Sequence, residues 1–370
     1  MTESAIAGAT STTLLAAMLG SASNPPELAV YRGTQTPREF DARERELAAL
    51  AQDAAVYDLG WQRRVAVRGE DRFRWLNGMV TNSVNGLGTH AGAWNLVLNA
   101  QGRILGDLTV WREEEKLELV IADDQFERLM EHLERFIIMD DVELVPLGEE
   151  PGAEETALGL AGHQADAVLE RMGLPTLTEP MTGTREEWNG LDLRILRGYG
   201  ALVPRYEIWT PAAGVMRLWR TFSTAGATPV GSEAMEAFRI AEGIPLYGID
   251  MVEKDLPQET SQLRALHFSK GCYLGQEIVE RIRSRGNVHR HLRGLELEGP
   301  VPDPGVELTI GGAQAGHITS AAELKLAGGT RVFALGMMRG EAEARNETLH
   351  YNTAAGAGTA RILAEPPKLN

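Results

Sequence analysis

The residues best suited to chemistry surround the only cysteine of the chain, in the run Lys270-Gly271-Cys272-Tyr273-Leu274-Gly275-Gln276-Glu277. Glycine adopts positive φ without strain, so the two glycines permit a tight turn around the thiol. Positive charge nearby favours the thiolate, and it is supplied by Lys270, Arg281, Arg283 and Arg285. The run predicts an accessible, reactive Cys272. An inert, buried cysteine beside a helix start is the alternative, because free cysteines are among the most buried residues.

Three histidines, His267, His289 and His291, lie on either side of that run. An imidazole can accept a thiol proton in nucleophilic catalysis, so a cysteine–histidine hydrolase is a second, less favoured alternative. Spacing in the sequence does not decide it, because such partners meet in space. A metal site is not predicted, since one thiolate cannot replace the four of a structural zinc or iron–sulfur site.

Length, composition and charge restrict the class of protein. The chain has 370 residues, of which 43% are apolar and 24% charged, which predicts two or three packed units and excludes a coiled coil or a largely disordered chain. Its 36 Lys and Arg against 52 Asp and Glu give a net charge of −16, the wrong sign for stable binding to nucleic acid. No apolar stretch predicts a membrane span, and no Lys or Arg precedes Arg32 as a secretory signal requires. With one unpaired thiol, we expect a cytoplasmic protein.

Periodicity predicts the elements that position these residues. A meander of three antiparallel strands is followed by an amphipathic helix that begins at Asp123. The expected elements of this first unit are a helix over 42–51, strands over 64–67, 94–98, 104–111, 117–121 and 142–147, and a short helix after residue 70. Strands with helices on one face predict an α+β unit.

Three further parts of the chain differ in composition. A Gly/Pro/Glu-rich segment over 148–155 indicates a linker, and after Glu298 short β-rich pieces separated by glycine pairs predict a small barrel or sandwich without a clear helix. The expected parts are an N-terminal segment (1–50) that packs with the second unit, a first unit (51–148), a second unit (149–298) that carries the site residues, and a C-terminal β-barrel (299–370).

The Cys272 run, followed by Arg285-Gly286 and Arg290, resembles the signature of the YgfZ branch of the aminomethyltransferase (GcvT) superfamily. Similar segments extend over roughly residues 40–345, and they include Asp58-Leu59-Gly60, Leu98–Arg103, Arg239–Pro245, Leu256–Glu259 and Gly316–Ser320. The resemblance implies an α+β fold of two ferredoxin-like α/β units plus a C-terminal β-barrel. These surround a central channel that holds tetrahydrofolate or a one-carbon derivative, and we expect Cys272 near its mouth.

The resemblance also assigns residues to that channel. Glu207 matches the family's pterin-binding glutamate, and a carboxylate accepts the amino group and ring N–H of a pterin edge as a bidentate pair. Tyr199 and Trp111 match aromatic positions that pack on folate, and Arg239 matches a position that lines the site. For Trp111, packing in the core is an equal alternative.

Two departures separate the chain from the folate-dependent aminomethyltransferases that it resembles. Those enzymes carry two adjacent aspartates after the meander turn, one serving the transfer, whereas this chain has Gly106-Asp107. Asp107 is still a candidate catalytic residue, as is Cys272. The alternative is that the Asp107 carboxylate only forms hydrogen bonds within the turn. The transferases' Arg-Thr-Gly-Tyr-Thr-Gly-Glu run is degraded here to Arg197–Leu202, and they lack the Cys272 run.

The resemblance therefore favours a tetrahydrofolate-binding protein that supports assembly or repair of iron–sulfur clusters in client enzymes, including those that modify tRNA. Its expected partners are folate and iron–sulfur client or assembly proteins. Two alternatives stay open: a folate-dependent aminomethyltransferase that uses Asp107, and an interaction module whose folate site is vestigial. The missing second aspartate predicts folate binding without useful aminomethyl transfer.

Overall fold

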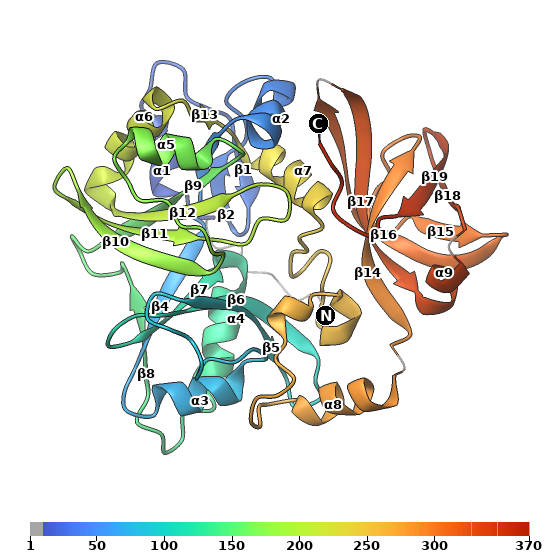
Figure 1. The fold of residues 1–370 in the computed structure, drawn as a ribbon, viewed down its shortest axis with the longest axis horizontal. Helices are drawn as coiled ribbons and strands as arrows, with labels where there is room; N and C mark the ends of the chain where they lie inside the picture. Colours follow the sequence, from blue (N-terminus) through green and yellow to red (C-terminus); the bar gives the residue numbers. More distant parts are fainter. Residues whose placement is uncertain (1–9, 287, 327, 346, 370) are drawn as a thin grey trace, which may run out of the picture.

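The chain forms two layered α+β units and a separate β-barrel, with the barrel at the right of Figure 1. The computed structural model describes residues 10–286, 288–326, 328–345 and 347–369. The predicted fold class, α+β with a C-terminal barrel, is confirmed.

A six-stranded sheet carries two helices on its outer face. The helices are buried through residues such as Val168 and Phe222, which pack on Leu158 of the sheet. The strands, in spatial order, are β10 (Thr182–Trp188), β11 (Leu191–Arg197), β12 (Arg205–Pro211), β9 (Glu155–Ala161), β3 (Ala55–Asp58) and β13 (Thr228–Pro229), and the helices are α5 (Ala165–Arg171) and α6 (Val215–Thr224).

A five-stranded antiparallel sheet forms the second layer and contains the predicted meander. Its outer face is covered by two helices, and the predicted apolar positions Phe126, Leu129 and Leu133 are buried there. The strands, in spatial order, are β5 (Gly92–Leu98), β6 (Ile104–Arg112), β7 (Leu117–Ala122), β4 (Gln62–Arg68) and β8 (Glu143–Leu147), and the helices are α3 (Arg72–Met79) and α4 (Asp123–Glu134).

The inner faces of the two sheets meet. Trp111 and Val120 of the five-stranded sheet share one hydrophobic cluster with Leu196 and Trp209 of the six-stranded sheet. Because side chains alternate between the faces of a strand, each strand at this interface sends every second residue toward the other sheet. Figure 1 shows the consequence, with helices outside and sheets inside.

The N-terminal part of the chain belongs to the six-stranded unit. All residues of β3 are buried, as is usual for a strand with neighbours on both sides. β3 pairs with β9 and β13 of the six-stranded sheet, and not with the five-stranded sheet that the rest of 51–148 forms. The range 51–148 is therefore not one contiguous unit. The other elements here are α1 (Leu14–Leu19), the hairpin β1 (Leu28–Tyr31) and β2 (Thr34–Pro37), α2 (Arg43–Gln52) and α7 (Ser232–Glu242). In this part, α1 packs on α6 and α2 packs on α7.

The C-terminal barrel is closed by six strands, but it starts before residue 299. Its first strand, β14, pairs with both β17 and β19, so it belongs to the barrel and not to the second unit. The strands, in spatial order, are β14 (Arg290–Glu298), β17 (Gly329–Arg339), β16 (Ala313–Leu326), β15 (Glu307–Ile310), β18 (Leu349–Thr353) and β19 (Gly356–Ile362). A short helix, α9 (Gly340–Arg345), differs from the expected all-β composition.

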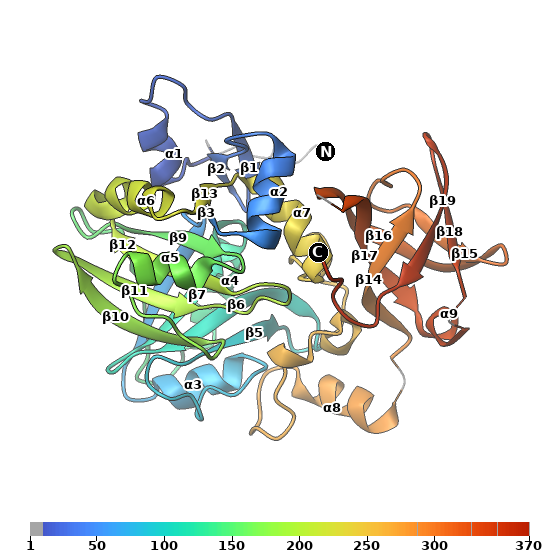
Figure 2. The ribbon, with the colours of Figure 1, turned by 45° about the horizontal axis from the view of Figure 1, so that its top comes forward.

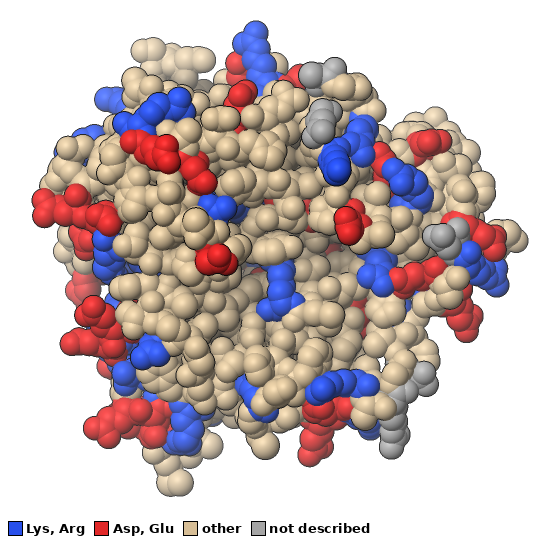
Figure 3. Space-filling model, in the orientation of Figure 1, with Lys and Arg blue, Asp and Glu red and all other residues tan. Residues whose placement is uncertain are grey.

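One further helix, α8 (Gln276–Arg285), lies near the bottom of both ribbon views, between the five-stranded unit and the barrel (Figure 2). Three short 3₁₀ turns complete the described elements: Ala212–Gly214, Pro257–Thr260 and Leu263–Ala265. On the face in Figure 3, acidic and basic side chains are interspersed around a largely uncharged middle. Among the described residues, no helix is long and apolar enough to cross a membrane.

Candidate functional site

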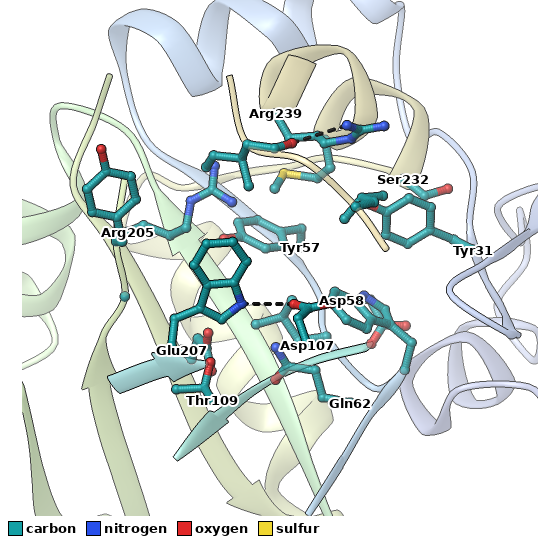
Figure 4. A pocket seen from close by; sticks show the side chains of 18 of the residues that line it. Tyr31, Tyr57, Asp58, Gln62, Asp107, Thr109, Arg205, Glu207, Ser232 and Arg239 are labelled. Carbon is teal, nitrogen blue, oxygen red and sulfur yellow. Dashed lines mark hydrogen bonds between the residues drawn. The ribbon is translucent and has the colours of Figure 1, made fainter. Parts of the chain in front are cut away.

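A cavity of about 220 Å³ lies where the inner faces of the two sheets meet α7 and the hairpin β1–β2. Figure 4 shows side chains from several of these elements pointing into the same space. The lining residues that matter below are Tyr57, Asp58, Gln62, Trp94, Asp107, Trp111, Tyr199, Arg205, Glu207, Arg239 and Arg264. The predicted residues Glu207, Asp107, Trp111, Tyr199 and Arg239 thus all line one cavity.

Two aromatic rings of the cavity each lie over a glycine on the neighbouring strand. Tyr57 is opposite Gly159, and a Cβ added there would lie 2.0 Å from the ring. Trp111 is opposite Gly92, where an added Cβ would lie 2.6 Å from the indole. A glycine inside a strand often marks such a close approach. The two glycines therefore fix where these rings lie.

Glu207 faces the cavity from β12. Among the described residues it forms no ion pair, although it lines the same cavity as three arginines. Burial raises the pKa of its carboxyl, while Arg194, a hydrogen bond with Gln62 and Arg205 lower it in part. A carboxylate in this setting is poised to accept hydrogen bonds from a ligand.

Several buried polar atoms around Glu207 have no partner among the described residues. They are Gln62 Oε1, an acceptor, and two donors, Trp111 Nε1 and Arg205 Nε. Buried polar groups are nearly always hydrogen-bonded, so an unpaired group calls for an explanation. All three belong to residues that line the cavity, so their hydrogen bonding is left to whatever fills it, water or a ligand.

Asp107 is held in place by two donors. Trp94 Nε1 lies 2.9 Å from its Oδ2 (the lower dashed line in Figure 4), and Gln125 Nε2 lies 3.1 Å from its Oδ1. It lines the cavity, as do Thr109 and Trp111, two and four residues further along β6. The carboxylate is therefore fixed and directed at the same space as Glu207.

Gly106, which the resemblance aligns with the other aspartate of the aminomethyltransferases, faces the opposite way. A Cβ there would lie 2.6 Å from Gln125 Oε1 and 3.0 Å from Leu129, both on α4. A larger side chain would collide with the helix rather than enter the cavity. The Gly106 departure therefore removes no carboxylate from the cavity of this chain.

Asp58 is a further cavity carboxylate, which the sequence analysis did not assign. It accepts hydrogen bonds from Thr13 Oγ1 and, at 2.8 Å, from the Gly60 amide. Burial raises its pKa to about 6, and these two hydrogen bonds lower it in part. The sequence analysis named Asp58-Leu59-Gly60 only as a segment that resembles the family and gave its carboxylate no role.

Arg239 lines the cavity, but its guanidinium is saturated by the protein. Its five N–H groups reach Glu236 (2.9 Å from Nε), Asp250, the Ile244 carbonyl at 3.1 Å and Ser320 Oγ at 3.3 Å. Because Ser320 is on β16, these bonds tie α7 to the barrel. Arg239 shapes the cavity wall and holds the two parts of the molecule together.

Tyr199 lies at an exposed end of the cavity against an arginine that the sequence analysis did not single out. Arg264 Cζ lies 3.8 Å from the Tyr199 ring centre and 4.6 Å from that of Trp94. Stacking of a guanidinium on aromatic rings is favourable and orients it. No motif signalled Arg264, because its role depends on two rings from distant parts of the chain.

Cys272 is exposed, which excludes the alternative of a buried cysteine. Among the described residues, none from Lys270–Glu277 lines the cavity, so the thiol is not part of its wall. Lys270 donates instead to the carbonyls of Val80 and Asn82, at 2.7 and 2.6 Å, and burial lowers its pKa to about 7. The ammonium is thus directed at the backbone, and the side chain of Arg285 lies outside the described residues.

The histidines give no support to a hydrolase. His291 Nδ1 lies 2.8 Å from Glu343, and His267 Nδ1 accepts the Ser269 amide at 3.3 Å. Among the described hydrogen bonds, none joins a histidine to Cys272.

The other residues of the Cys272 run have local structural roles. Gly275 has φ 81° at the start of α8, and a Cβ there would lie 2.9 Å from Gly102 Cα in the β5–β6 turn. Gln276 Oε1 accepts the Tyr273 amide at 3.2 Å, and Glu277 is in the first turn of α8. Gly271 has open space around it and an ordinary φ. Two motifs found separately in the sequence, around residues 102 and 275, are therefore in contact.

Fold and cavity together define the class: two α+β units whose sheets enclose a ligand-sized cavity, with a barrel attached. Residues 21–270 match the family model described as the GCVT N-terminal domain. The chain belongs to this GCVT family.

Similar proteins extend the comparison over most of the chain. An aminomethyltransferase of Rubrobacter xylanophilus is 28% identical over 300 residues, 78% of each chain. A chloroplastic protein of Arabidopsis thaliana, named as a candidate transferase, is 26% identical over 339 residues, which are 89% of this chain and 74% of that one. The crystal structure of the glycine cleavage system aminomethyltransferase T from Bartonella henselae has a TM-score of 0.83 at 19% identity, and the match covers 98% of this chain and 99% of that one. This last likeness concerns the fold.

Proposed function

We propose that the chain binds tetrahydrofolate, or a one-carbon derivative of it, in the cavity between the two sheets. The observation that carries the proposal is Glu207, a cavity carboxylate without an ion-pair partner among the described residues. Membership of the GCVT family supports the same ligand.

The polar atoms of the cavity suit a pterin ring. A pterin presents an amino group and a ring N–H on one edge, with a carbonyl oxygen next to them. Glu207 and Gln62 Oε1 offer acceptors, and Trp111 Nε1 and Arg205 Nε offer donors. Tyr57 and Trp111 add aromatic surface for a planar ring. The donor and acceptor types present are the ones this ligand needs.

A calorimetric titration with tetrahydrofolate tests the proposal. Loss of a hydrogen bond to a charged group costs about 1.5–3 kcal/mol, so Glu207→Ala should weaken binding roughly 10- to 150-fold. Glu187→Ala, at an exposed position of β10, is the matched control and should bind like the wild type. Unchanged affinity of Glu207→Ala would remove this residue from the site, and no binding by the wild type would refute the proposal.

The finer part of the proposal is that this folate protein supports assembly or repair of iron–sulfur clusters in client enzymes, including tRNA-modifying ones, through Cys272. The support is the resemblance of the Lys270–Glu277 run to the YgfZ branch, together with the exposure of the thiol. An exposed thiol outside the cavity suits contact with a partner protein. Cells that lack the native protein should regain the activity of iron–sulfur enzymes with the wild type but not with Cys272→Ser, at equal protein levels. Full complementation by the serine variant would refute the role of the thiol.

Aminomethyl transfer is a second candidate function, and Asp107 favours it. This carboxylate lines the cavity, while the glycine that replaces the neighbouring aspartate points at α4. The expectation of folate binding without useful transfer therefore needs a direct test, with the aminomethyl-loaded carrier protein of the glycine cleavage system as substrate. If the chain is a transferase, Asp107→Asn should lower the rate about 10²- to 10⁴-fold and retain folate affinity. Absence of turnover by a folate-binding wild type would exclude this candidate.

A further inference from the structure

Arg264 is the one cavity arginine without an ion pair among the residues that the structure describes. Arg205 pairs with Glu242, and Arg239 pairs with Glu236 and Asp250. The only described hydrogen bond of the Arg264 side chain runs from Nε to Gln262 Oε1, at 3.2 Å. Burial lowers the pKa of Arg264 to about 10, and Tyr199, Glu242 and Asp107 offset this only in part.

The Arg264 guanidinium is oriented before any ligand arrives. It lies against Tyr199 and Trp94, at 3.8 and 4.6 Å from the two ring centres, and Trp94 is itself held by Asp107. A guanidinium stacked on a ring keeps its in-plane N–H groups available for a bidentate partner. A planar anion, such as a carboxylate, fits that edge.

Arg264 also stands at the boundary between the cavity and a second pocket. Tyr199, Ile244 and Arg264 line both. The second pocket has a volume of about 380 Å³ and lies between the end of α7, residues 261–264 and strand β14 of the barrel. The two pockets are therefore adjacent, with Tyr199, Ile244 and Arg264 between them.

Ser261 lies in the wall of the second pocket. Its φ is 58°, an uncommon value for a residue other than glycine, and its Oγ is buried without a partner among the described residues. Strained backbone persists where the surroundings hold it, and it is concentrated at binding sites. The second pocket thus contains a hydroxyl that a ligand can satisfy.

The geometry points to Arg264 as the residue that binds a carboxylate on the tail of the cavity ligand, with the remainder of the tail leaving through the second pocket. This assignment rests on the proposed function, in which Glu207 binds the pterin edge. In tetrahydrofolate the carboxylate belongs to the glutamate. Glu207 then faces the pterin and Arg264 the carboxylate, which disfavours the reversed ligand, because that ligand would bring its carboxylate to Glu207.

The experiment compares tetrahydrofolate with tetrahydropteroate, which lacks the glutamate, by calorimetric titration of the full chain. The wild type should bind tetrahydrofolate about 10- to 150-fold more tightly, because only that ligand offers Arg264 a carboxylate. Arg264→Gln should lose that preference and bind tetrahydropteroate as the wild type does. Arg283→Gln, which also removes an arginine stacked on an aromatic ring but lies outside both pockets, should retain the preference.

The outcomes separate the two claims. If the wild type binds both ligands equally, or if Arg264→Gln weakens both to the same extent, the assignment of Arg264 is overturned while folate binding stands. If the wild type binds neither ligand, the proposed function itself fails. The wild-type comparison is informative even if the variant does not fold.

Discussion

The space between the two sheets ends in two chemically different ways. At one end, Arg194 pairs with Glu118 and with Glu113, and Arg64 and Lys116 also lie within 3.6 Å of Glu118. Burial alone would raise the pKa of Glu118, but Arg194, Arg64 and Lys116 lower it to about 2. At the other end, the cavity holds Glu207 and Asp58 without an ion-pair partner among the described residues.

This difference distinguishes the charges that stabilise the fold, around Glu118, from the cavity carboxylates that are available to a ligand. A buried carboxylate is costly unless it is paired, and the Glu118 end is paired within the protein. The cavity end retains this cost in the free protein, because burial keeps the pKa values of Glu207 and Asp58 raised. Arg194 connects the two ends, since it also lowers the pKa of Glu207. Variants at the two ends should therefore affect stability in opposite directions.

The largest effect is expected at the paired end. Arg194→Met leaves Glu118, which is fully buried, with weaker partners, and breaking a buried pair costs about 3–5 kcal/mol. Urea denaturation should show this loss in the free energy of unfolding. Adding Glu118→Gln to Arg194→Met should recover part of it, because the uncompensated charge is gone. A loss below about 1 kcal/mol in the single variant would mean that the charges of this end are not critical for folding.

Asp58→Asn should have the next largest effect, with the opposite sign and a dependence on pH. The folded pKa of about 6 exceeds the ordinary value of 3.8, so the folded state binds the extra proton between these values. The contribution of Asp58 to stability is therefore present below pH 3.8 and is lost as the pH rises through 6. One pKa unit corresponds to about 1.4 kcal/mol, so the asparagine should be more stable than the wild type by up to about 3 kcal/mol above pH 7.

The check on Asp58 is a series of urea denaturation curves from pH 4 to 8. The difference between variant and wild type should shrink toward pH 4, where the wild-type carboxyl is neutral. A difference that does not change with pH would show that the substitution acts through packing against Thr13 and not through the charge.

Glu207→Gln should change both stability and binding. Burial raises the pKa of this carboxyl, and Arg194, Gln62 and Arg205 lower it only in part, so its removal should stabilise the free protein. The affinity for tetrahydrofolate should fall at the same time. If the variant lost both stability and affinity, Glu207 would stabilise the fold as Glu118 does, and the proposed difference between the two ends would be wrong.

The sequence predicted the parts of the molecule whose signals are local. The meander and the amphipathic helix α4 have periodic signals, and the β-rich pieces have glycine pairs between them, one of which, Gly311-Gly312, joins β15 to β16; all are present. The assignment of β3 and β14 to units failed, because strand pairing joins residues that are distant in the chain. The same holds for the site. The resemblance assigned Glu207, Asp107 and Trp111 to one cavity. Arg264 and Asp58 were not assigned, because their contacts with Tyr199, Trp94 and Thr13 join residues that are distant in the sequence.

The smallest effect is expected at Cys272, which belongs to neither end. The side chain is exposed and lines no part of the cavity, and surface substitutions usually change stability by no more than about 0.5 kcal/mol. Cys272→Ser should therefore match the wild type in urea denaturation and in tetrahydrofolate titration, although we expect it to fail in complementation. Gly275→Ala is the informative contrast, because an added Cβ would lie 2.7 Å from the Asn99 carbonyl and the native φ is 81°. If Cys272→Ser destabilised the chain as much as Gly275→Ala does, the thiol would have a structural role in the loop. The conclusion that Cys272 contributes neither to folding nor to ligand binding would then be wrong.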